Sequence, residues 1–411
     1  MSAERWGVDA AGRGRAGEHP ASEQSAAAER LALISWSAIA EPADEAAAWL
    51  VDTLGAAGSL AWAVRCGTDP VGATHELAPH ADRASIDKAV AASARWLARM
   101  DAAEPEAHLR RAHLVGARAV TRVDAEWPQA FDVLGGARPY TLWVRGGGDV
   151  GELLDHAVAI VGSRASTAYG EHLAAEIAGG AGDAGWCVVS GGAYGIDGAA
   201  HRAALTTATP TVAMMAGGVD RPYPAGHTDL LEAVMRAGAI VSEVPVGYAP
   251  YRQRFLNRNR MIATAAATCV VEAAERSGAL STANVAADCG RPVGAVPGPV
   301  TSIGSTGCHR LIRDGMAVLV RSWADLAELA GPLQPDAVAG VGEGFASPAQ
   351  RAAFDAIAIR GSTAEAVARG AGLTIGEVLG ALAALELEGK VAARAGVWRR
   401  VNAEVTTAQR G

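Results

Sequence analysis

The sequence predicts an α/β protein built on a Rossmann-like parallel sheet with helices on both faces. Short β-branched runs alternate with helical patterns across residues 119–330, beginning with Ala157–Val161. The further predicted strands are Thr141–Val144, Trp186–Val189, Thr211–Met215, Ala239–Val241, Thr268–Val271, Val293–Val296 and Ala317–Val320. Strands that are apolar on both faces and alternate with amphipathic helices indicate a parallel sheet covered on both sides.

The residues before this domain predict a tail followed by a small helical domain. Residues 1–26 are polar and lack periodicity, so we expect a disordered tail. Residues 27–118 show helical patterns, notably at Glu45–Leu54 and Ser85–Met100, with Gly55 and Gly58 as breaks. The segment around these glycines is either a DNA-contacting unit like a helix-hairpin-helix or a structural appendage.

The residues after the central domain predict a winged-helix-like domain over 347–403. A linker at 331–346 precedes Ser347-Pro348, a pair typical of a helix start. Helical patterns at 348–359, 363–370 and 374–388 are followed by two short β runs around Ala395-Gly396, and a tail at 404–411 ends the chain. A short helical bundle would share the helical part of this pattern.

Charge and cysteine usage narrow the function classes. The 411 residues carry a formal net charge of −8, so any contact with nucleic acid requires a local basic patch. The five cysteines are dispersed without a CxxC pair, which favours reduced thiols and argues against a zinc site. No apolar run reaches the roughly 20 residues that span a bilayer. We therefore expect a cytoplasmic protein with no membrane, metal or cofactor.

Two glycine-rich turns follow the first two strands of the central domain. Gly162, Ser163 and Arg164 form the first, and Ser190, Gly191 and Gly192 the second. Glycine lets the backbone approach a ligand, a helix N-terminus offers free N–H groups to an anion, and Arg164 adds a guanidinium. Alternatively these glycines only turn the chain. Neither turn has the G-x-x-x-x-G-K-[ST] spacing of a P-loop.

Asp197 and His201 lie four residues apart and would share a helix face. They could form a metal or acid–base pair. We favour a structural hydrogen bond, because short motifs of this kind often arise by chance.

An arginine-rich segment is the strongest single signal. Arg252, Arg254, Arg258 and Arg260 fall within ten residues together with Tyr251, Phe255 and Asn259 and without an acidic residue. Guanidinium groups suit phosphates and aromatic rings suit unstacked bases, so this mixture predicts single-stranded nucleic-acid binding. The alternative is a solvated helix start. Further along, Ser277, Gly278 and Thr282 could donate to phosphate or only cap a helix.

Together these elements resemble the DprA/Smf family of DNA-processing proteins over residues 120–330. The resemblance is carried by Gly162-Ser163-Arg164, Tyr169-Gly170, Ser190-Gly191-Gly192, Gly195-Ile196-Asp197, His201, Gly217-Gly218, Tyr223-Pro224, Ser242-Glu243, Arg258-Asn259-Arg260, Glu272, Ser277-Gly278, Thr282-Ala283, Gly290-Arg291-Pro292, Pro297-Gly298, Ser305-Thr306-Gly307 and Asp314-Gly315.

The resemblance implies a binder of single-stranded DNA that is not an enzyme. It also implies a homodimer that delivers the strand to the RecA recombinase, as in DNA uptake and natural transformation. Arg164, Arg252 and Phe255 match the family's pocket arginine, basic residue and stacking phenylalanine. Leu256 replaces the usual proline after that phenylalanine.

Two other functions remain open. A Rossmann-type nucleotide phosphoribohydrolase would need a P-G-G-x-G-T-x-x-E motif, which Pro297-Gly298-Pro299 does not supply. The C-terminal domain could instead bind duplex DNA or a protein, with Arg394, Arg399 and Arg400 as phosphate contacts or as ordinary surface charge.

Overall fold

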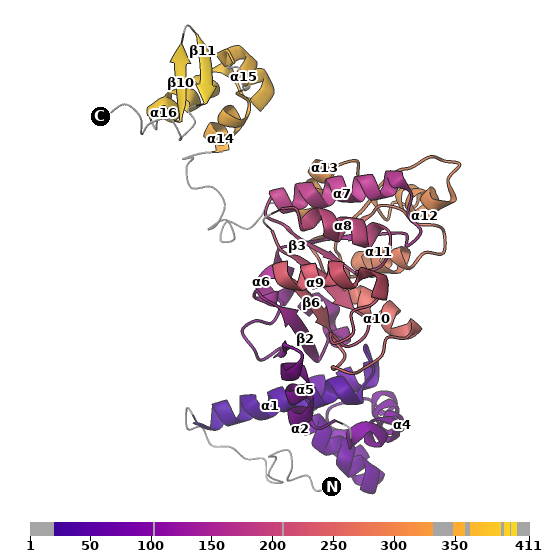
Figure 1. Ribbon diagram of the computed structural model, residues 1–411. Helices are drawn as coiled ribbons and strands as arrows, with labels where there is room; N and C mark the ends of the chain where they lie inside the picture. Colours follow the sequence, from indigo (N-terminus) through magenta and orange to yellow (C-terminus); the bar gives the residue numbers. More distant parts are fainter. Residues whose placement is uncertain are drawn as a thin grey trace. The chain divides into compact units, whose positions relative to one another are not determined.

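The computed structural model describes residues 20–331, except 102 and 208, and residues 348–400, except 358–361, 388, 389 and 395. The chain divides into two compact units, residues 1–332 and 333–411 (Figure 1). Most of the predicted tails and linker, at 1–19, 332–346 and 404–411, lie outside the described residues.

A nine-stranded sheet forms the centre of the first unit, in the order β1-β2-β6-β5-β4-β3-β7-β8-β9. The strands are β1 (Ala117–Thr121), β2 (Thr141–Gly146), β3 (Ala157–Val161), β4 (Cys187–Ser190), β5 (Thr211–Met215), β6 (Ala239–Ser242), β7 (Ala267–Val270), β8 (Val293–Ala295) and β9 (Val318–Leu319). The strands from β6 to β9 in this order pair in parallel, so the predicted fold class is confirmed.

The far edge of the sheet departs from the prediction. Strand β1 was not predicted, and it pairs antiparallel with β2, which pairs antiparallel with β6. Its sequence, Ala-Arg-Ala-Val-Thr, has few residues that favour strands and continues a helical stretch. Pairing with β2 therefore decides its conformation.

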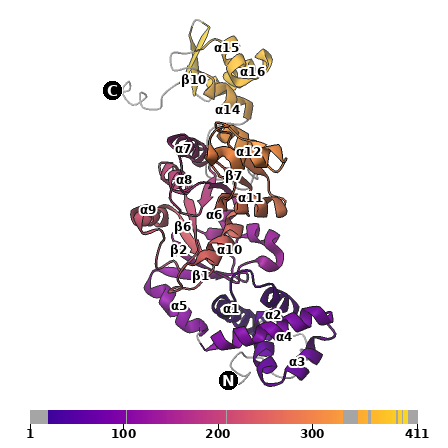
Figure 2. The same cartoon turned by 90° about the vertical axis from the view of Figure 1, so that its right-hand side faces the viewer.

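Helices cover both faces of the sheet. They are α6 (Val150–Asp155), α7 (Ala168–Asp183), α8 (Ile196–Ala204), α9 (Thr228–Ala237), α10 (Arg252–Ile262), α11 (Gly278–Asp288), α12 (Thr306–Arg313) and α13 (Trp323–Ala330). In Figure 2, α7, α8 and α9 lie on one side of the strands and α11 and α12 on the other. The strands are consequently buried on both faces, as β3 and β5 show over their whole length.

The N-terminal helices form a layer with its own core. They are α1 (Pro20–Ile39), α2 (Glu45–Thr68), α3 (Pro70–Leu77), α4 (Arg83–Met100) and α5 (Pro105–Leu114). Trp36, Trp62 and Trp96 are fully buried in it, and the rings of Trp36 and Trp96 meet edge to face at 5.2 Å.

Two predictions for this layer are wrong. Helix α1 begins at Pro20, so the expected tail ends at least seven residues early; proline is favoured in a first helical turn, and the alanines that follow favour a helix. Helix α2 is interrupted at Gly55, where φ is 73° and ψ is 167°, as predicted, but it continues through Gly58, where the second break was predicted.

Helix α2 is long and apolar enough to cross a membrane by length and composition. Of the described residues, only the pair α15 (Ala364–Ala371) and α16 (Ile375–Leu387) meets the same test, and only if the two are joined across a 108° bend. Leu50 and Leu60 of α2 are fully buried in the core of the helical layer.

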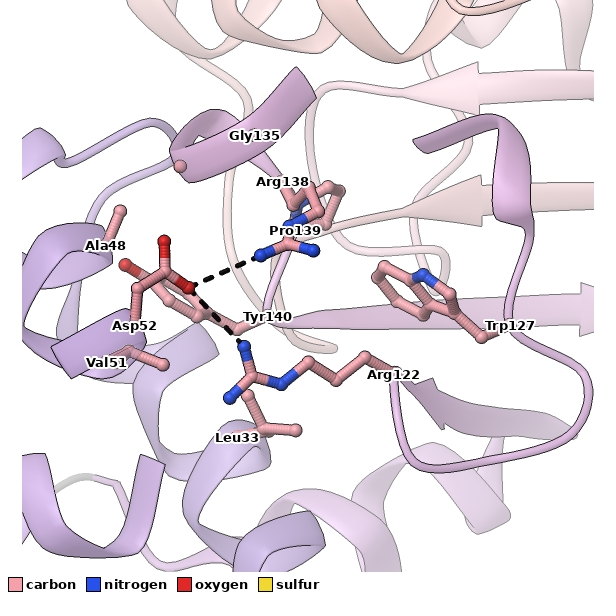
Figure 3. Close-up of a pocket in the computed structure, with 11 residues that line it drawn as sticks. Leu33, Ala48, Val51, Asp52, Arg122, Trp127, Gly135, Arg138, Pro139 and Tyr140 are labelled. Atoms are coloured by element: carbon pink, nitrogen blue, oxygen red, sulfur yellow. Dashed lines mark hydrogen bonds and ion pairs between the residues drawn. The ribbon is translucent and has the colours of Figure 1, made fainter. Parts of the chain in front are cut away.

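Ion pairs join the helical layer to the segment before β2. Figure 3 shows the Asp52 carboxylate between the guanidinium groups of Arg122 and Arg138, beside the ring of Tyr140. Arg122 also contacts Glu29 at 2.9 Å, and Arg30 contacts Asp124 at 2.9 Å. The predicted boundary at residue 118 therefore lies inside one compact unit.

The second unit has the predicted winged-helix pattern. It contains α14 (Pro348–Asp355), α15 (Ala364–Ala371) and α16 (Ile375–Leu387), followed by the ribbon β10 (Val391–Arg394) and β11 (Val397–Arg400). Val367, Leu382 and Leu385 are buried in its core.

Candidate nucleic-acid interface

A cavity of about 370 Å³ lies at the carboxyl ends of the central strands. In the sheet, β3 lies between β4, the next strand in the sequence, and β7. Strands β4 to β6 extend the sheet on one side of β3 and strands β7 to β9 on the other, so the strand order reverses between β3 and β7. Ligands of open α/β sheets bind at such a switch point. The lining residues are Val161, Gly162, Ser163, Arg164, Ala165, Ala193, Asp197, Arg258, Asn259, Ile262, Ala274, Ser277, Gly278, Ala279 and Thr282. More than half of the predicted binding residues are among them.

The loop after β3 forms one rim of the cavity. Gly162 is needed for close packing, because a Cβ atom there would lie 2.6 Å from the Ile196 side chain and 3.0 Å from the Glu272 carbonyl. Arg164 is exposed, so its guanidinium can reach a ligand from solvent. Ser163 turns its hydroxyl back to accept from the Ala165 amide at 3.2 Å.

The loop after β4 has a different role from the one predicted. Ser190 is fully buried and donates to the Ile160 carbonyl at 2.6 Å, while Gly191 and Gly192 are buried and do not line the cavity. The Gly191 amide donates to Asp197 and its carbonyl accepts from Arg258. Both backbone groups of Gly191 are thus already paired, and none of the three residues lines the cavity. We therefore correct the assignment of Ser190, Gly191 and Gly192 from ligand contacts to residues that support the lining.

Asp197 is the one carboxylate among the residues that line the cavity. It is 7% exposed, and its Oδ2 accepts from the amides of Gly191 at 3.1 Å and Ala193 at 3.3 Å. Burial raises the pKa of Asp197, although the charge of Arg258 and the two amides oppose this shift.

The loop after β7 is tied to the loop after β3 by Glu272. Its carboxylate accepts from the Thr167 amide at 2.8 Å and the Thr167 hydroxyl at 2.6 Å. Ser277 caps α11 by accepting from the Ala279 amide, as one of its two predicted roles required. Ser277, Gly278 and Thr282 all line the cavity.

Helix α10 carries the arginine-rich segment and presents Arg258 and Asn259 to the cavity. Arg258 is 5% exposed, and its guanidinium donates to the carbonyls of Gly191 and Met214. Burial lowers the pKa of Arg258 to about 10, with Arg164 adding to the shift and Asp197 opposing it. Arg252 is exposed in the first turn of the helix but does not line the cavity.

Arg254 and Arg260 are not presented to the cavity, which corrects their predicted role. Arg254 is 8% exposed, pairs with Glu41 of the helical layer at 3.2 Å and lies 4.7 Å from the centre of the Tyr251 ring. Arg260 pairs with buried Glu243 at 2.6 Å and donates to the Ala137 carbonyl at 2.7 Å. A count of arginines along the sequence does not separate these structural cations from exposed ones.

Phe255 lies beside the rim arginine. The Arg164 guanidinium is 5.4 Å from the centre of the Phe255 ring, and the Tyr223 ring meets the Phe255 ring edge to face with its centre 5.6 Å away. Tyr223 is 49% exposed. The sequence did not single out Tyr223 as a site residue, since it comes from a loop about 30 positions away.

His201 and Asp197 do not form the hydrogen bond that we favoured. The Thr211 hydroxyl donates to the Val188 carbonyl at 2.6 Å and so accepts from His201 Nδ1–H at 2.9 Å. His201 Nε2 has no hydrogen-bond partner in the described part of the chain. Burial lowers the pKa of His201 to about 3, helped by His227, Arg258 and Arg202. No cluster of three or more metal-binding side chains occurs among the described residues.

Comparison with known proteins identifies this arrangement. The family model of DNA recombination-mediator protein A matches residues 118–331, and the DprA winged helix domain matches residues 333–397. The chain belongs to the DprA family. A putative DNA processing protein DprA of Mycobacterium tuberculosis is 41% identical over 90% of this chain and 94% of its own length. Protein Smf of Escherichia coli is 35% identical over 64% of this chain and 72% of its own.

A solved structure supports the same assignment. The DNA processing protein A of Streptococcus pneumoniae aligns with a TM-score of 0.56 and 26% identity, over 72% of this chain and 95% of that one. The family match to the second unit also confirms its winged-helix fold.

Replacing Arg260 tests whether it is a structural cation. Arg260→Ala leaves Glu243 buried without its partner, so we expect the free energy of unfolding to fall by about 3–5 kcal/mol. Arg252→Ala, at an exposed position of the same helix, should change it by no more than about 0.5 kcal/mol. Urea denaturation measures both, and unchanged stability of Arg260→Ala would return this residue to the candidate ligand contacts.

His201 should make the fold sensitive to acid. The pKa of about 3 in the folded state lies below the ordinary value near 6.5, so only the unfolded chain takes up this proton between those pH values. The free energy of unfolding should thus fall as the pH drops below about 6.5, by up to about 1.4 kcal/mol per unit from this group. The contribution is absent above that pH.

The comparison with His201→Asn isolates this effect. Asparagine keeps a donor for Thr211 but does not titrate, so the variant should lose less stability than the parent between pH 6.5 and 5 in urea denaturation, as linkage requires. Equal slopes for the two proteins would show that His201 is already accessible to protons when folded.

Proposed function

We propose that this protein binds single-stranded DNA in the cavity at the β3–β7 switch point and acts as a recombination mediator. The observation that carries the proposal is that Arg164 and Arg258 line one cavity, and that the Phe255 ring, outside this lining, lies 5.4 Å from the Arg164 guanidinium. Guanidinium groups and open amides bind phosphates, and an aromatic ring that is partly accessible, as Phe255 is, can stack on a base. The protein carries a net charge of −8, but the positive charge of these arginines is concentrated at one place. It can therefore attract the phosphates of a single strand there.

The cavity supports a narrower set of contacts than the sequence suggested. Gly162, Ser163, Arg164, Ser277, Gly278 and Thr282 line it together with Arg258 and Asn259. Arg252 is exposed and lies three residues before Phe255 in the first turn of α10, outside the lining of the cavity. We include Arg252 as an outer phosphate contact.

The family membership supports the wider role. Its relatives are DNA processing proteins by name, and the matching family model describes a recombination mediator. We infer that the chain protects incoming or exposed single strands in the cytoplasm, as a homodimer, and loads the RecA recombinase on them. Size-exclusion chromatography and a pull-down with purified RecA test these two partners.

The residues of α16 argue against binding of duplex DNA through this helix of the winged-helix unit. The third helix of such a domain is the element that usually enters the major groove. Residues Ile375–Leu387 contain no lysine or arginine, and Ile375 and Leu379 are exposed. Of the ribbon arginines, Arg399 is exposed, whereas Arg400 packs on Phe354 with its guanidinium 4.8 Å from the ring centre.

The salt dependence of binding tests the phosphate contacts. Affinity for an unstructured oligonucleotide should fall linearly with the logarithm of salt concentration, and duplex DNA of the same length should bind more weakly. Arg164→Ala should lower the affinity roughly tenfold, equivalent to about 1.4 kcal/mol, and reduce the slope by about 0.7 because one phosphate contact is lost. Fluorescence anisotropy over a salt series measures both quantities.

The matched control is Arg236→Ala, an exposed arginine on α9 with side-chain exposure of 72%. It should leave the slope unchanged. Salt-independent binding by the parent protein, or an equal effect of the two substitutions, would contradict the proposed phosphate site. Release of free base from mononucleotides would instead revive the phosphoribohydrolase function.

Replacing Phe255 tests whether a base stacks on its ring, independently of the phosphate contacts. Phe255→Ala should cost about 1–3 kcal/mol of binding free energy while leaving the salt slope near its parent value, since no phosphate contact is removed. Leu256→Ala, at the adjacent exposed position, is the control and should bind normally. A parent-like affinity for Phe255→Ala would mean that no base stacks on this ring.

A further inference from the structure

A second hollow, of about 380 Å³, lies between the helical layer and helix α10. We call it the outer groove. Its charged and amide side chains are Glu41, Asp44, Arg95, Arg99, Gln253 and Asn257. The two carboxylates come from the segment between α1 and α2, the two arginines from α4 and the two amides from α10. The outer groove shares no lining residue with the cavity at the β3–β7 switch point, so it is a separate site.

The carboxylates of the outer groove already have partners. Asp44 caps α2, where its Oδ1 accepts from two backbone amides, and its Oδ2 accepts from the Trp96 indole at 3.1 Å. Glu41 accepts from the Tyr251 hydroxyl at 2.6 Å and pairs with Arg254 at 3.2 Å. These bonds hold both carboxylates against the protein, so they are poorly placed to repel an anion in the groove.

The two arginines of α4 are the more accessible charges. Arg95 is 65% exposed, whereas Asp44, its partner at 3.2 Å, is 11% exposed. Arg99 pairs with Glu41 at 2.8 Å and is also exposed. Among the described residues, each of these arginines donates through one terminal nitrogen. The remaining N–H groups of each guanidinium can therefore donate to a phosphate, and exposed ion pairs are weak enough to rearrange.

Helix α10 separates the outer groove from the cavity. Gln253 and Asn257, four residues apart, face the groove. Asn259 and Ile262, three residues apart, line the cavity. At about 100° of rotation per residue, the exposed Arg252 lies on a third stripe between these two faces. Because a helix is only about 10–12 Å wide, a short stretch of single strand reaches from the cavity over this stripe into the groove.

We propose that the outer groove binds the phosphates of the single strand beyond the nucleotides held in the cavity, with Arg95 and Arg99 as the contacts. This inference rests on the proposed function, because the cavity has to hold the strand first. The aromatic residue that lines the groove, Trp96, is 1% exposed and cannot stack on a base. The groove should therefore bind the backbone alone, and the helical layer becomes part of the nucleic-acid interface.

Probe length separates the outer groove from the cavity. The probes are oligodeoxythymidines of about 5 and about 12 nucleotides, and two hybrids of the longer length that keep about 5 thymidines at one end or the other and are otherwise abasic. At low salt, Arg95→Ala should bind the longer probe about fivefold more weakly than the parent and the shorter probe equally well. The salt slope for the longer probe should fall by about 0.7, since one phosphate contact is lost. One of the hybrids should show the same loss. Fluorescence anisotropy measures all four affinities.

Arg83→Ala is the matched control. Arg83 is an exposed arginine of the same helix that pairs with Asp87 at 2.9 Å and does not line the groove, so its removal should leave every affinity unchanged. Arg95→Lys keeps the charge and should recover most of the parent affinity for the longer probe. Urea denaturation should show a stable Arg95→Ala, because Asp44 keeps its bonds to α2 and to Trp96.

Three results would overturn the inference. They are parent-like affinity of Arg95→Ala for the longer probe, an equal loss on both probe lengths, and an equal loss in Arg83→Ala. A loss on the longer oligodeoxythymidine but on neither hybrid would show contact with bases, which also contradicts a groove for phosphates. Failure of the parent protein to bind any probe would overturn the proposed function itself.

Discussion

The burial of one cation, Arg258, organises the region around the cavity. An isolated guanidinium cannot be removed from water without partners, and here the carbonyl groups of Gly191 and Met214 supply them. A Cβ atom on Gly191 would lie 2.6 Å from this guanidinium, so glycine at that position is a condition of the contact. The loop after β4, strand β5 and helix α10 are thereby held together.

Helix α10 serves three regions at once, and its residues divide by helical face. Arg258 and Asn259 face the cavity, Arg254 and Asn257 hold the helical layer, and Arg260 reaches the segment before β2. Although burial opposes the shift, the hydrogen bond from Tyr251 and the nearby arginines lower the pKa of Glu41. That carboxylate therefore stays ionised at neutral pH as a partner for Arg254.

The sequence was sufficient for the parallel part of the sheet and for the position of the cavity. Strand runs such as Ala157–Val161 are apolar throughout, and the carboxyl ends of parallel strands must meet at one edge, so the loops after β3 and β7 had to come together. The roles of individual arginines could not be read in the same way. Arg252 and Arg254 are two positions apart, yet one is exposed and the other is covered by Glu41 from more than 200 positions earlier. Strand β1 was missed for a similar reason, since only its neighbour β2 makes it a strand.

The position of Arg254 on the same rigid helix as Arg258 couples the helical layer to the cavity mechanically. A helix of this length transmits a tilt at one end to the other with little loss, because its backbone hydrogen bonds resist bending. Separating Glu41 from Arg254 would therefore leave a buried guanidinium without its carboxylate partner on the helix that also carries Arg258. The helical layer and the lining of the cavity thus depend on the same helix.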